Sequence, residues 1–267
     1  MDTARDRSEG DRLILVTGGA RSGKSTFAER LAAQLAEPGG GRVTYLATSE
    51  THDPEMAQRV AAHQSARPTS WTTIECPIEV PAAVRASARA ALEGAALGSR
   101  AADAAAAPGS AAPPVFLLDC VTLWVTNLLF SGGAFGGSEP PDDGYNYDKD
   151  LLPADEERAA AGRVTAAVDD LLAALGETGA TLVAVTNEVG LGVVPEYPLA
   201  RLYRDQLGWA NQRLARSAGR VYFLVSGYPL DVKALAVPWP QAVSAAGLAS
   251  YASSPAAPPF PVKESDQ

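Results

Sequence analysis

A glycine-rich segment near the N-terminus has the residue types and spacing of a phosphate-binding loop. It matches the pattern G-x-x-x-x-G-K-[ST] and comprises, in order, Gly18, Gly19, Ala20, Arg21, Ser22, Gly23, Lys24 and Ser25. Glycines let the backbone turn so that successive N–H groups face phosphate oxygens, Lys24 adds a positive charge, and the Ser25 hydroxyl is a ligand for Mg²⁺. A turn that only joins a strand to a helix is the alternative. The order of strand, motif and helix favours nucleotide binding.

An acidic residue, Asp119, ends a run of apolar residues at 115–118. A metal bound to a nucleotide needs a second oxygen ligand at the end of a neighbouring buried strand, and Asp119 has that position. The alternative is that Asp119 caps a helix beginning near Val121, and the two roles are compatible. The residues thus indicate a Mg²⁺-dependent protein that uses a nucleotide, and they leave open what receives the phosphoryl group.

Six apolar or β-branched runs have the length of strands and alternate with segments of helical character. The expected strands cover residues 13–17, 43–47, 71–75, 115–119, 182–186 and 221–226. The expected helices cover residues 24–36, 54–65, 121–130, 156–175 and 199–217. Apolar strands that alternate with helices predict an α/β fold whose mostly parallel sheet is buried on both faces.

The other segments have the composition of insertions, loops and extensions. Residues 82–112 are rich in alanine and predict a helix that buries little area, and residues 131–148 combine glycine, proline and acids as a surface loop does. Residues 1–11 are expected to be an N-terminal extension, and residues 231–267 a C-terminal extension with a disordered end. A single nucleotide-binding domain is therefore expected over residues 12–230.

Charge and cysteine content exclude several classes of protein. The chain has 22 lysine and arginine residues against 31 aspartate and glutamate residues, a formal net charge of −9, which disfavours a nucleic-acid partner. Two cysteines, Cys76 and Cys120, cannot form a disulfide framework, so a reducing cytoplasm is expected. The sequence shows no segment with the pattern of a signal peptide or a membrane span.

The second of two histidines, His63, lies in the expected helix at 54–65, seven residues after Met56, so the two side chains share a face. By itself this placement is typical of a packed or terminus-capping histidine. A neutral imidazole is, however, also a competent nucleophile at cytoplasmic pH. Spacing alone does not separate these two roles.

Seven sequence blocks, in order, resemble the bifunctional adenosylcobinamide kinase / adenosylcobinamide-phosphate guanylyltransferase family. They lie between residues 13 and 227 and read GGARSGKS, TYLATS, EMAQRVAAHQSARPTSW, TTIE, LLDCVTLWVTNLL, VTNEVGLGVVPE and NQRLA. The histidine block and the VTNEVG block are more specific than the phosphate-binding loop. The resemblance implies a P-loop NTPase (RecA-like) fold, assembled as a homotrimer.

The resemblance also implies two reactions in the assembly of the nucleotide loop of cobalamin (vitamin B12). ATP or GTP phosphorylates adenosylcobinamide, and GTP then gives its GMP to the new phosphate, which yields adenosylcobinamide-GDP and pyrophosphate. By the match, His63 would be the catalytic nucleophile that carries GMP as a phosphoramidate. Lys24 and Mg²⁺, held by Ser25 and Asp119, would neutralise charge on the phosphates.

Further nucleotide contacts are carried over by position in the matching blocks. The residues concerned are Ala47, Thr48, Ser49, Gln64, Ser65, Ala66, Arg67, Glu75 and Asp119. Asn187 and Glu188 end an expected strand at the edge where open α/β sheets collect ligands. These two receive no assigned role, because contact with the corrinoid, positioning of water and helix capping by Asn187 all fit.

Two other functions fit the residues without the resemblance. One is a P-loop kinase of another small metabolite, in which His63 is structural and no covalent nucleotide forms. The other is a nucleotide-dependent switch that hydrolyses slowly, although no paired switch segments are recognisable. A nucleic-acid motor is disfavoured by length and negative charge.

Overall fold

The computed structural model describes residues 12–40, 42–49, 68–101, 112–131 and 154–237. The chain divides into two compact units, residues 1–231 and 232–267. The described part of the second unit contains the short helix α7 (Val232–Leu235). Within the described helices, none has both the length and the apolar character required to span a bilayer.

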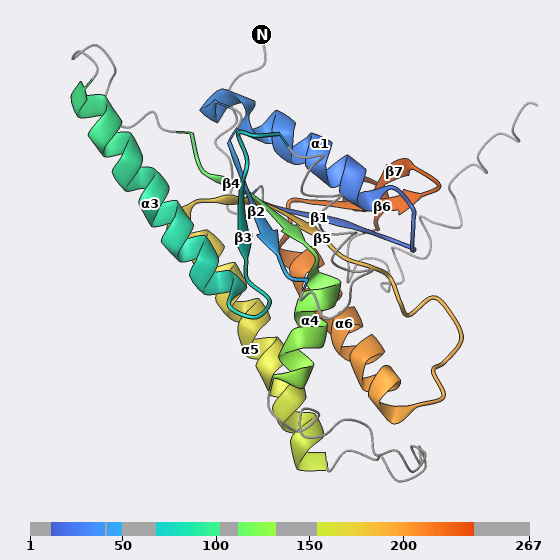
Figure 1. Cartoon of the computed structure of the whole chain (residues 1–267). Helices are drawn as coiled ribbons and strands as arrows, with labels where there is room; N and C mark the ends of the chain where they lie inside the picture. Colours follow the sequence, from blue (N-terminus) through green and yellow to red (C-terminus); the bar gives the residue numbers. More distant parts are fainter. Residues whose placement is uncertain (1–11, 41, 50–67, 102–111, 132–153, 238–267) are drawn as a thin grey trace, which may run out of the picture. The chain divides into compact units, whose positions relative to one another are not determined.

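A seven-stranded sheet forms the centre of the described part of the first unit (Figure 1). Its spatial order is β3-β2-β4-β5-β1-β6-β7, and each pair is parallel except β6 with β7. The strands are β1 (Leu13–Gly18), β2 (Val43–Ala47), β3 (Thr72–Glu75), β4 (Val115–Asp119), β5 (Thr181–Val185), β6 (Arg220–Val225) and β7 (Tyr228–Asp231). The predicted strands are all present with ends within one residue, so the predicted α/β fold is confirmed.

Strand β7 was not predicted, because residues 228–230 were assigned to the end of the domain without a strand. It pairs antiparallel with β6 through a tight turn at Ser226 and Gly227. Both turn residues have positive φ, 51° and 87°, as a two-residue hairpin of the primed type requires. A Ser-Gly pair between two apolar runs was the available signal for this hairpin.

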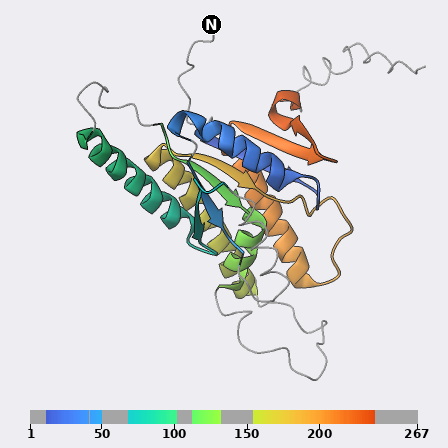
Figure 2. The same cartoon turned by 45° about the horizontal axis from the view of Figure 1, so that its top comes forward.

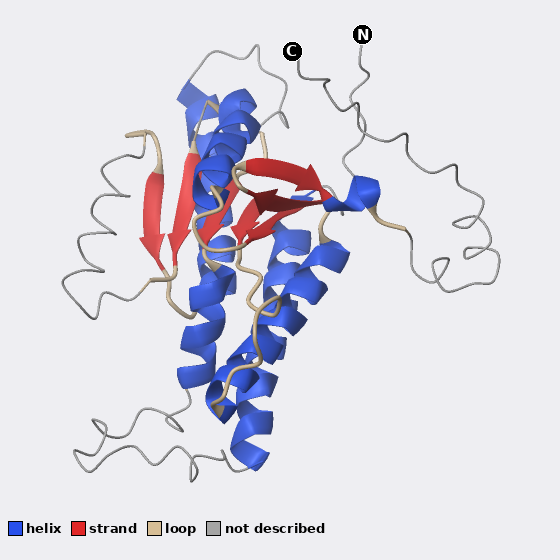
Figure 3. Cartoon of the chain, turned by 90° about the vertical axis from the view of Figure 1, so that its right-hand side faces the viewer, coloured by secondary structure: helices blue, strands red, loops and turns tan. Residues whose placement is uncertain are grey.

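Helices cover both faces of the sheet (Figures 1, 2 and 3). Helix α1 (Lys24–Ala36), followed by the short 3₁₀ helix η2 (Glu37–Gly39), lies on one face. The other face is covered by α3 (Val80–Ala101), α4 (Val121–Phe130), α5 (Ala154–Thr178) and α6 (Pro198–Ser217). Four of the predicted helices are thereby confirmed, whereas the one at 54–65 lies outside the described residues, as does most of the loop at 131–148.

The alanine-rich helix α3 begins at Val80, before the alanine run, and contributes more to the core than expected. Val80, Val84 and Ala88 are at most 1% exposed and pack with the core on that face. Spaced four residues apart, they form one stripe along the helix. Small apolar side chains thus let α3 lie close to α5 and the sheet.

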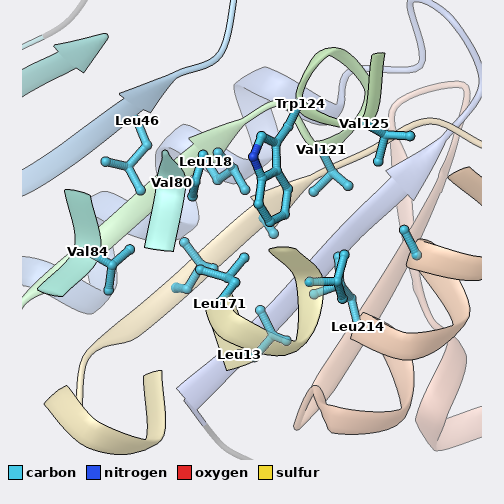
Figure 4. Close-up of a cluster of buried hydrophobic side chains, with 14 of the residues drawn as sticks. Leu13, Leu46, Val80, Val84, Leu118, Val121, Trp124, Val125, Leu171 and Leu214 are labelled. Atoms are coloured by element: carbon cyan, nitrogen blue, oxygen red, sulfur yellow. The ribbon is translucent and has the colours of Figure 1, made fainter. Parts of the chain in front are cut away.

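Trp124 of α4 is the largest fully buried side chain and lies at the centre of this core (Figure 4). Its indole Nε1 donates a hydrogen bond to the backbone oxygen of Ile78 at 2.7 Å, so the polar edge of the ring is satisfied inside the protein. Around it lie Val80, Leu118, Val121 and Leu171 (Figure 4). The Trp124 side chain therefore holds α4 against the sheet, next to the end of β4.

We expect Trp124→Ala to lower the free energy of unfolding by about 3–5 kcal/mol, because it leaves a cavity and an unpaired Ile78 carbonyl. Trp209→Ala is the matched control, since Trp209 of α6 is 36% exposed and its loss is expected to cost less than about 1 kcal/mol. Urea unfolding followed by circular dichroism measures both. Equal losses in the two variants would contradict the assigned role of Trp124.

Candidate active site

The segment 18–25, called here the phosphate loop, leaves the end of β1 and turns into α1. Gly18 and Gly23 have positive φ, 151° and 92°, and Arg21 has φ of 54°. A Cβ on Gly18 would lie 2.6 Å from the backbone oxygen of Leu224, so that position excludes any other residue. Gly23 caps α1 without a side-chain hydrogen bond, which leaves the first N–H groups of the helix available to phosphate oxygens.

The β6–β7 hairpin supports the phosphate loop from the side. The backbone N–H of Gly227 donates to the backbone oxygen of Ser22 at 3.0 Å. A Cβ on Gly23 would lie 3.5 Å from the Cα of Gly227, so the two backbones run in close contact. The hairpin that the sequence analysis missed is thus a structural neighbour of the loop.

Lys24 is buried at the start of α1, with 8% of its surface exposed. Its Nζ donates to the backbone oxygen of Gly19 at 2.6 Å, which holds the ammonium group inside the phosphate loop. Burial lowers the pKa of Lys24, and electrostatic interactions with Cys120 and Asp119 oppose that shift. Lys24 and Asp119, predicted from separate motifs, therefore lie close enough to interact electrostatically.

Asp119 lies at the carboxyl end of β4, where its Oδ2 accepts a hydrogen bond from the Tyr45 hydroxyl at 3.0 Å. The N-cap of α4 is Cys120 and makes no side-chain capping bond, so Asp119 does not cap that helix. Tyr45 is a site residue that the sequence analysis did not identify. It is recognisable only once β2 and β4 are known to be neighbours.

Ser25 and Asp119 supply a hydroxyl and a carboxylate, the hard oxygen ligands that Mg²⁺ prefers. The Ser25 side chain is half-buried in the first turn of α1. Among the described residues no group of three or more histidine, cysteine or acidic side chains forms a metal cluster. The donor set accordingly fits Mg²⁺ shared between the protein and phosphate oxygens better than a metal bound by the protein alone.

Four further residues expected at the nucleotide lie at the same edge of the sheet. Ala47 pairs in register with Asp119 on one side and with Glu75 on the other. Thr48 is fully buried, and its hydroxyl both donates to the backbone oxygen of Cys120 and accepts from its N–H, each at 2.8 Å. The hydroxyl of Thr48 thus ties β2 to the β4–α4 junction, and half-buried Ser49 follows it.

The remaining predicted residues lie outside the part of the chain that the structure describes. They are His63, Gln64, Ser65, Ala66 and Arg67. Their roles rest on the sequence.

Asn187 and Glu188 follow β5 and lie beside the phosphate loop. The next helix, α6, begins only at Pro198, so Asn187 does not cap a helix. The backbone N–H of Glu188 donates to the backbone oxygen of Gly18 at 3.2 Å, and its Oε1 accepts hydrogen bonds from Thr17 and Asn211 at 2.9 and 3.3 Å. Thr17 and Asn211 are further residues that sequence reasoning missed, since their hydrogen bonds join segments far apart in the chain.

Several known proteins are similar to this chain over most of its length. "Bifunctional adenosylcobalamin biosynthesis protein CobU" of Salmonella typhimurium is 39% identical over 221 residues, which cover 83% of this chain and 99% of that protein. The CobU of Escherichia coli is 38% identical with the same coverage, and "Bifunctional adenosylcobalamin biosynthesis protein CobP" of Pseudomonas aeruginosa is 38% identical over 82% of this chain and 96% of its own. A solved structure, "ATPase Domain of G40P", superposes with a TM-score of 0.41 at 11% identity, covering 81% of this chain and 70% of its own.

The sequence profile of one family matches residues 14–97 and 99–232, a range that includes the phosphate loop, Asp119 and Glu188. This match and the relatives cover most of the chain, so the resemblance seen in the sequence is confirmed. The chain belongs to the family described as cobinamide kinase / cobinamide phosphate guanyltransferase.

Proposed function

We propose that this chain phosphorylates adenosylcobinamide with ATP or GTP and then transfers GMP from GTP to the product, which gives adenosylcobinamide-GDP and pyrophosphate. The proposal rests on one observation: Lys24 and Asp119 lie close enough to interact electrostatically at the carboxyl edge of the sheet. The phosphate loop lies beside them and leads into α1. This arrangement suits reactions in which charge moves between phosphate groups. The cobinamide substrate is inferred from the family to which the chain belongs.

One nucleotide site serves both reactions in this proposal. In the first, the cobinamide hydroxyl oxygen bonds to the γ-phosphorus, and the bond from that phosphorus to the β–γ bridging oxygen breaks. In the second, an imidazole nitrogen of His63 bonds to the α-phosphorus of GTP while pyrophosphate leaves, and the cobinamide phosphate then displaces the histidine. The phosphate loop and Lys24 bind the β- and γ-phosphates in each case.

Mg²⁺ held by Ser25 and Asp119 would neutralise negative charge on the phosphates. The hydroxyl of Tyr45 orients the Asp119 carboxylate through its hydrogen bond to Oδ2. Further contacts with the nucleotide are assigned to the residues at the ends of β2 and β3 and to those after His63, namely Ala47, Thr48, Ser49, Gln64, Ser65, Ala66, Arg67 and Glu75. We also propose a cytoplasmic homotrimer, as the resemblance implies.

The test incubates the full chain with adenosylcobinamide, Mg²⁺ and either ATP or GTP, and follows the corrinoid products by chromatography and mass spectrometry. We expect adenosylcobinamide phosphate first and adenosylcobinamide-GDP only with GTP. Asp119→Asn is expected to slow both steps by at least about tenfold because it removes a charged metal ligand. Hydrolysis of nucleotide without modified corrinoid would contradict the proposal and favour a kinase of another metabolite.

A further inference from the structure

Strand β5 lies between the strand that carries the phosphate loop and the strand that ends in Asp119. Val185, its last residue, pairs in register with Val16 of β1 on one side and with Asp119 of β4 on the other. The chain that continues past Val185 therefore emerges between the phosphate loop and the proposed metal ligand. A side chain placed there is next to both parts of the proposed phosphate site.

The chain stays extended beyond the end of β5. The N–H of Thr186 donates to the backbone oxygen of Val16 at 2.9 Å, and the N–H of Glu188 donates to that of Gly18 at 3.2 Å. These two bonds continue the parallel ladder with β1 by two more residues. Side chains 186, 187 and 188 consequently alternate between the two faces of the sheet.

The neighbours of the flanking side chains show which face each one takes. The Thr186 hydroxyl donates to Oδ1 of Asn211 at 2.7 Å, and Glu188 accepts from Nδ2 of the same residue. Asn211 belongs to α6, so Thr186 and Glu188 point to the face that α6 covers. Asn187 points to the opposite face, as Val185 does, which is the face covered by α1 (Figure 1).

Asp119 points to that same face. Its neighbours along β4, Val115 and Leu117, belong to the core beneath α1, and so does Tyr45, which binds the carboxylate. Because α1 is also the helix that the phosphate loop enters, Asn187 shares a face and a sheet edge with both predicted parts of the phosphate site.

The backbone of Asn187 is held on both sides, while its carboxamide has no hydrogen-bond partner among the described residues. Its N–H donates to the Thr122 hydroxyl at 3.0 Å, and its carbonyl accepts from Nδ2 of Asn211 at 3.0 Å. Asn211 is itself 6% exposed and braced by Thr186. The described part of the protein thus fixes the backbone of this half-buried residue and makes no hydrogen bond to its amide group.

We propose that the carboxamide N–H of Asn187 donates a hydrogen bond to the terminal phosphate of a bound nucleoside triphosphate and so distinguishes triphosphate from diphosphate. An amide suits this position because it donates to a phosphate oxygen without adding negative charge beside Asp119. Glu188 is a positioning residue in this arrangement. Its Oε1 is bonded to Thr17 and Asn211 on the other face, where it fixes the backbone of its neighbour.

The inference rests on the nucleotide site of the proposed function and needs no corrinoid. Calorimetry on the full chain with Mg²⁺ compares the affinity for a non-hydrolysable GTP analogue with that for GDP. Asn187→Ala is expected to lower the affinity for the analogue by about tenfold or more and to change the affinity for GDP by less than about twofold. Asn187→Asp is expected to lower the affinity for the analogue further, because a carboxylate repels the terminal phosphate.

Gln212→Ala is the matched control, since Gln212 is an exposed amide residue on α6 whose described contact is a hydrogen bond from Arg216. It is expected to leave both affinities unchanged. The proposal is overturned if Asn187→Ala retains the wild-type melting temperature and lowers the affinities for GDP and for the analogue equally, or lowers neither. A wild-type chain that binds both nucleotides but leaves adenosylcobinamide unmodified would instead refute the proposed function and keep this inference intact.

Discussion

Lys24→Ala is expected to lower the rates of both phosphorylation and guanylyl transfer by at least about 100-fold. The ammonium group is buried inside the phosphate loop and interacts with Asp119. The loss follows from weaker binding of the β- and γ-phosphates, which take part in both reactions. Product formation with adenosylcobinamide and GTP measures the two rates.

The fold of this variant is expected to be at least as stable as that of the wild type without nucleotide. Burial is the main influence on Lys24 and disfavours its charged form, so its removal relieves a desolvation cost. Lys233→Ala, at an exposed lysine, is the matched control and is expected to leave both rates unchanged. Loss of only one reaction in Lys24→Ala would contradict a single nucleotide site.

The lowered pKa of Lys24 leads us to expect that nucleotide binding depends on pH. Because burial lowers the pKa of Lys24, the charged form that binds phosphate is present below that lowered pKa and is lost at a lower pH than for an exposed lysine. Nucleotide affinity of the wild type is therefore expected to fall as the pH rises through that lowered pKa. Titration of affinity against pH should show no such fall in Lys24→Ala.

His63→Ala is expected to abolish guanylyl transfer, by about 1000-fold or more, while phosphorylation stays within about fivefold of the wild type. The imidazole is the proposed nucleophile toward the α-phosphorus, whereas phosphorylation depends on the phosphate loop, Lys24 and Asp119. Incubation with Mg²⁺ and α-labelled GTP, followed by denaturing electrophoresis, measures the covalent intermediate. The label on the wild type should be lost in acid and stable in alkali, as a phosphoramidate is.

The chain offers a matched control in its other histidine, His52. His52→Ala is expected to retain both the label and the transferase activity. If His63→Ala still carried label, or lost phosphorylation as severely as guanylyl transfer with its fold intact, the division of roles would be wrong. Absence of label on the wild type, with a control showing that GTP is bound, would instead make His63 a packing residue and the chain a kinase.

Much of the fold was predictable because its signals are local. The strands at 43–47 and 115–119 and the helices at 24–36 and 121–130 have the predicted ends, since each is a short apolar run or a periodic segment next to a turn. The hairpin strand β7 was missed because residues 228–231 are mostly exposed and carry no apolar alternation. Its pairing with β6 depends on the turn at Ser226 and Gly227 rather than on the strand itself.

The sequence by itself determined the phosphate loop, because its chemistry depends on eight consecutive residues, and the place of Asp119, because a buried strand ends there. Only the tertiary structure decided that β5 inserts between β1 and β4, that Tyr45 binds Asp119, and that the hairpin at Gly227 supports Ser22. Strand order in a parallel sheet follows from how helices bury both faces at once, and no local pattern records it. Asn187 illustrates the difference, since its residue type is readable in the sequence but its face and its neighbours exist only in the folded sheet.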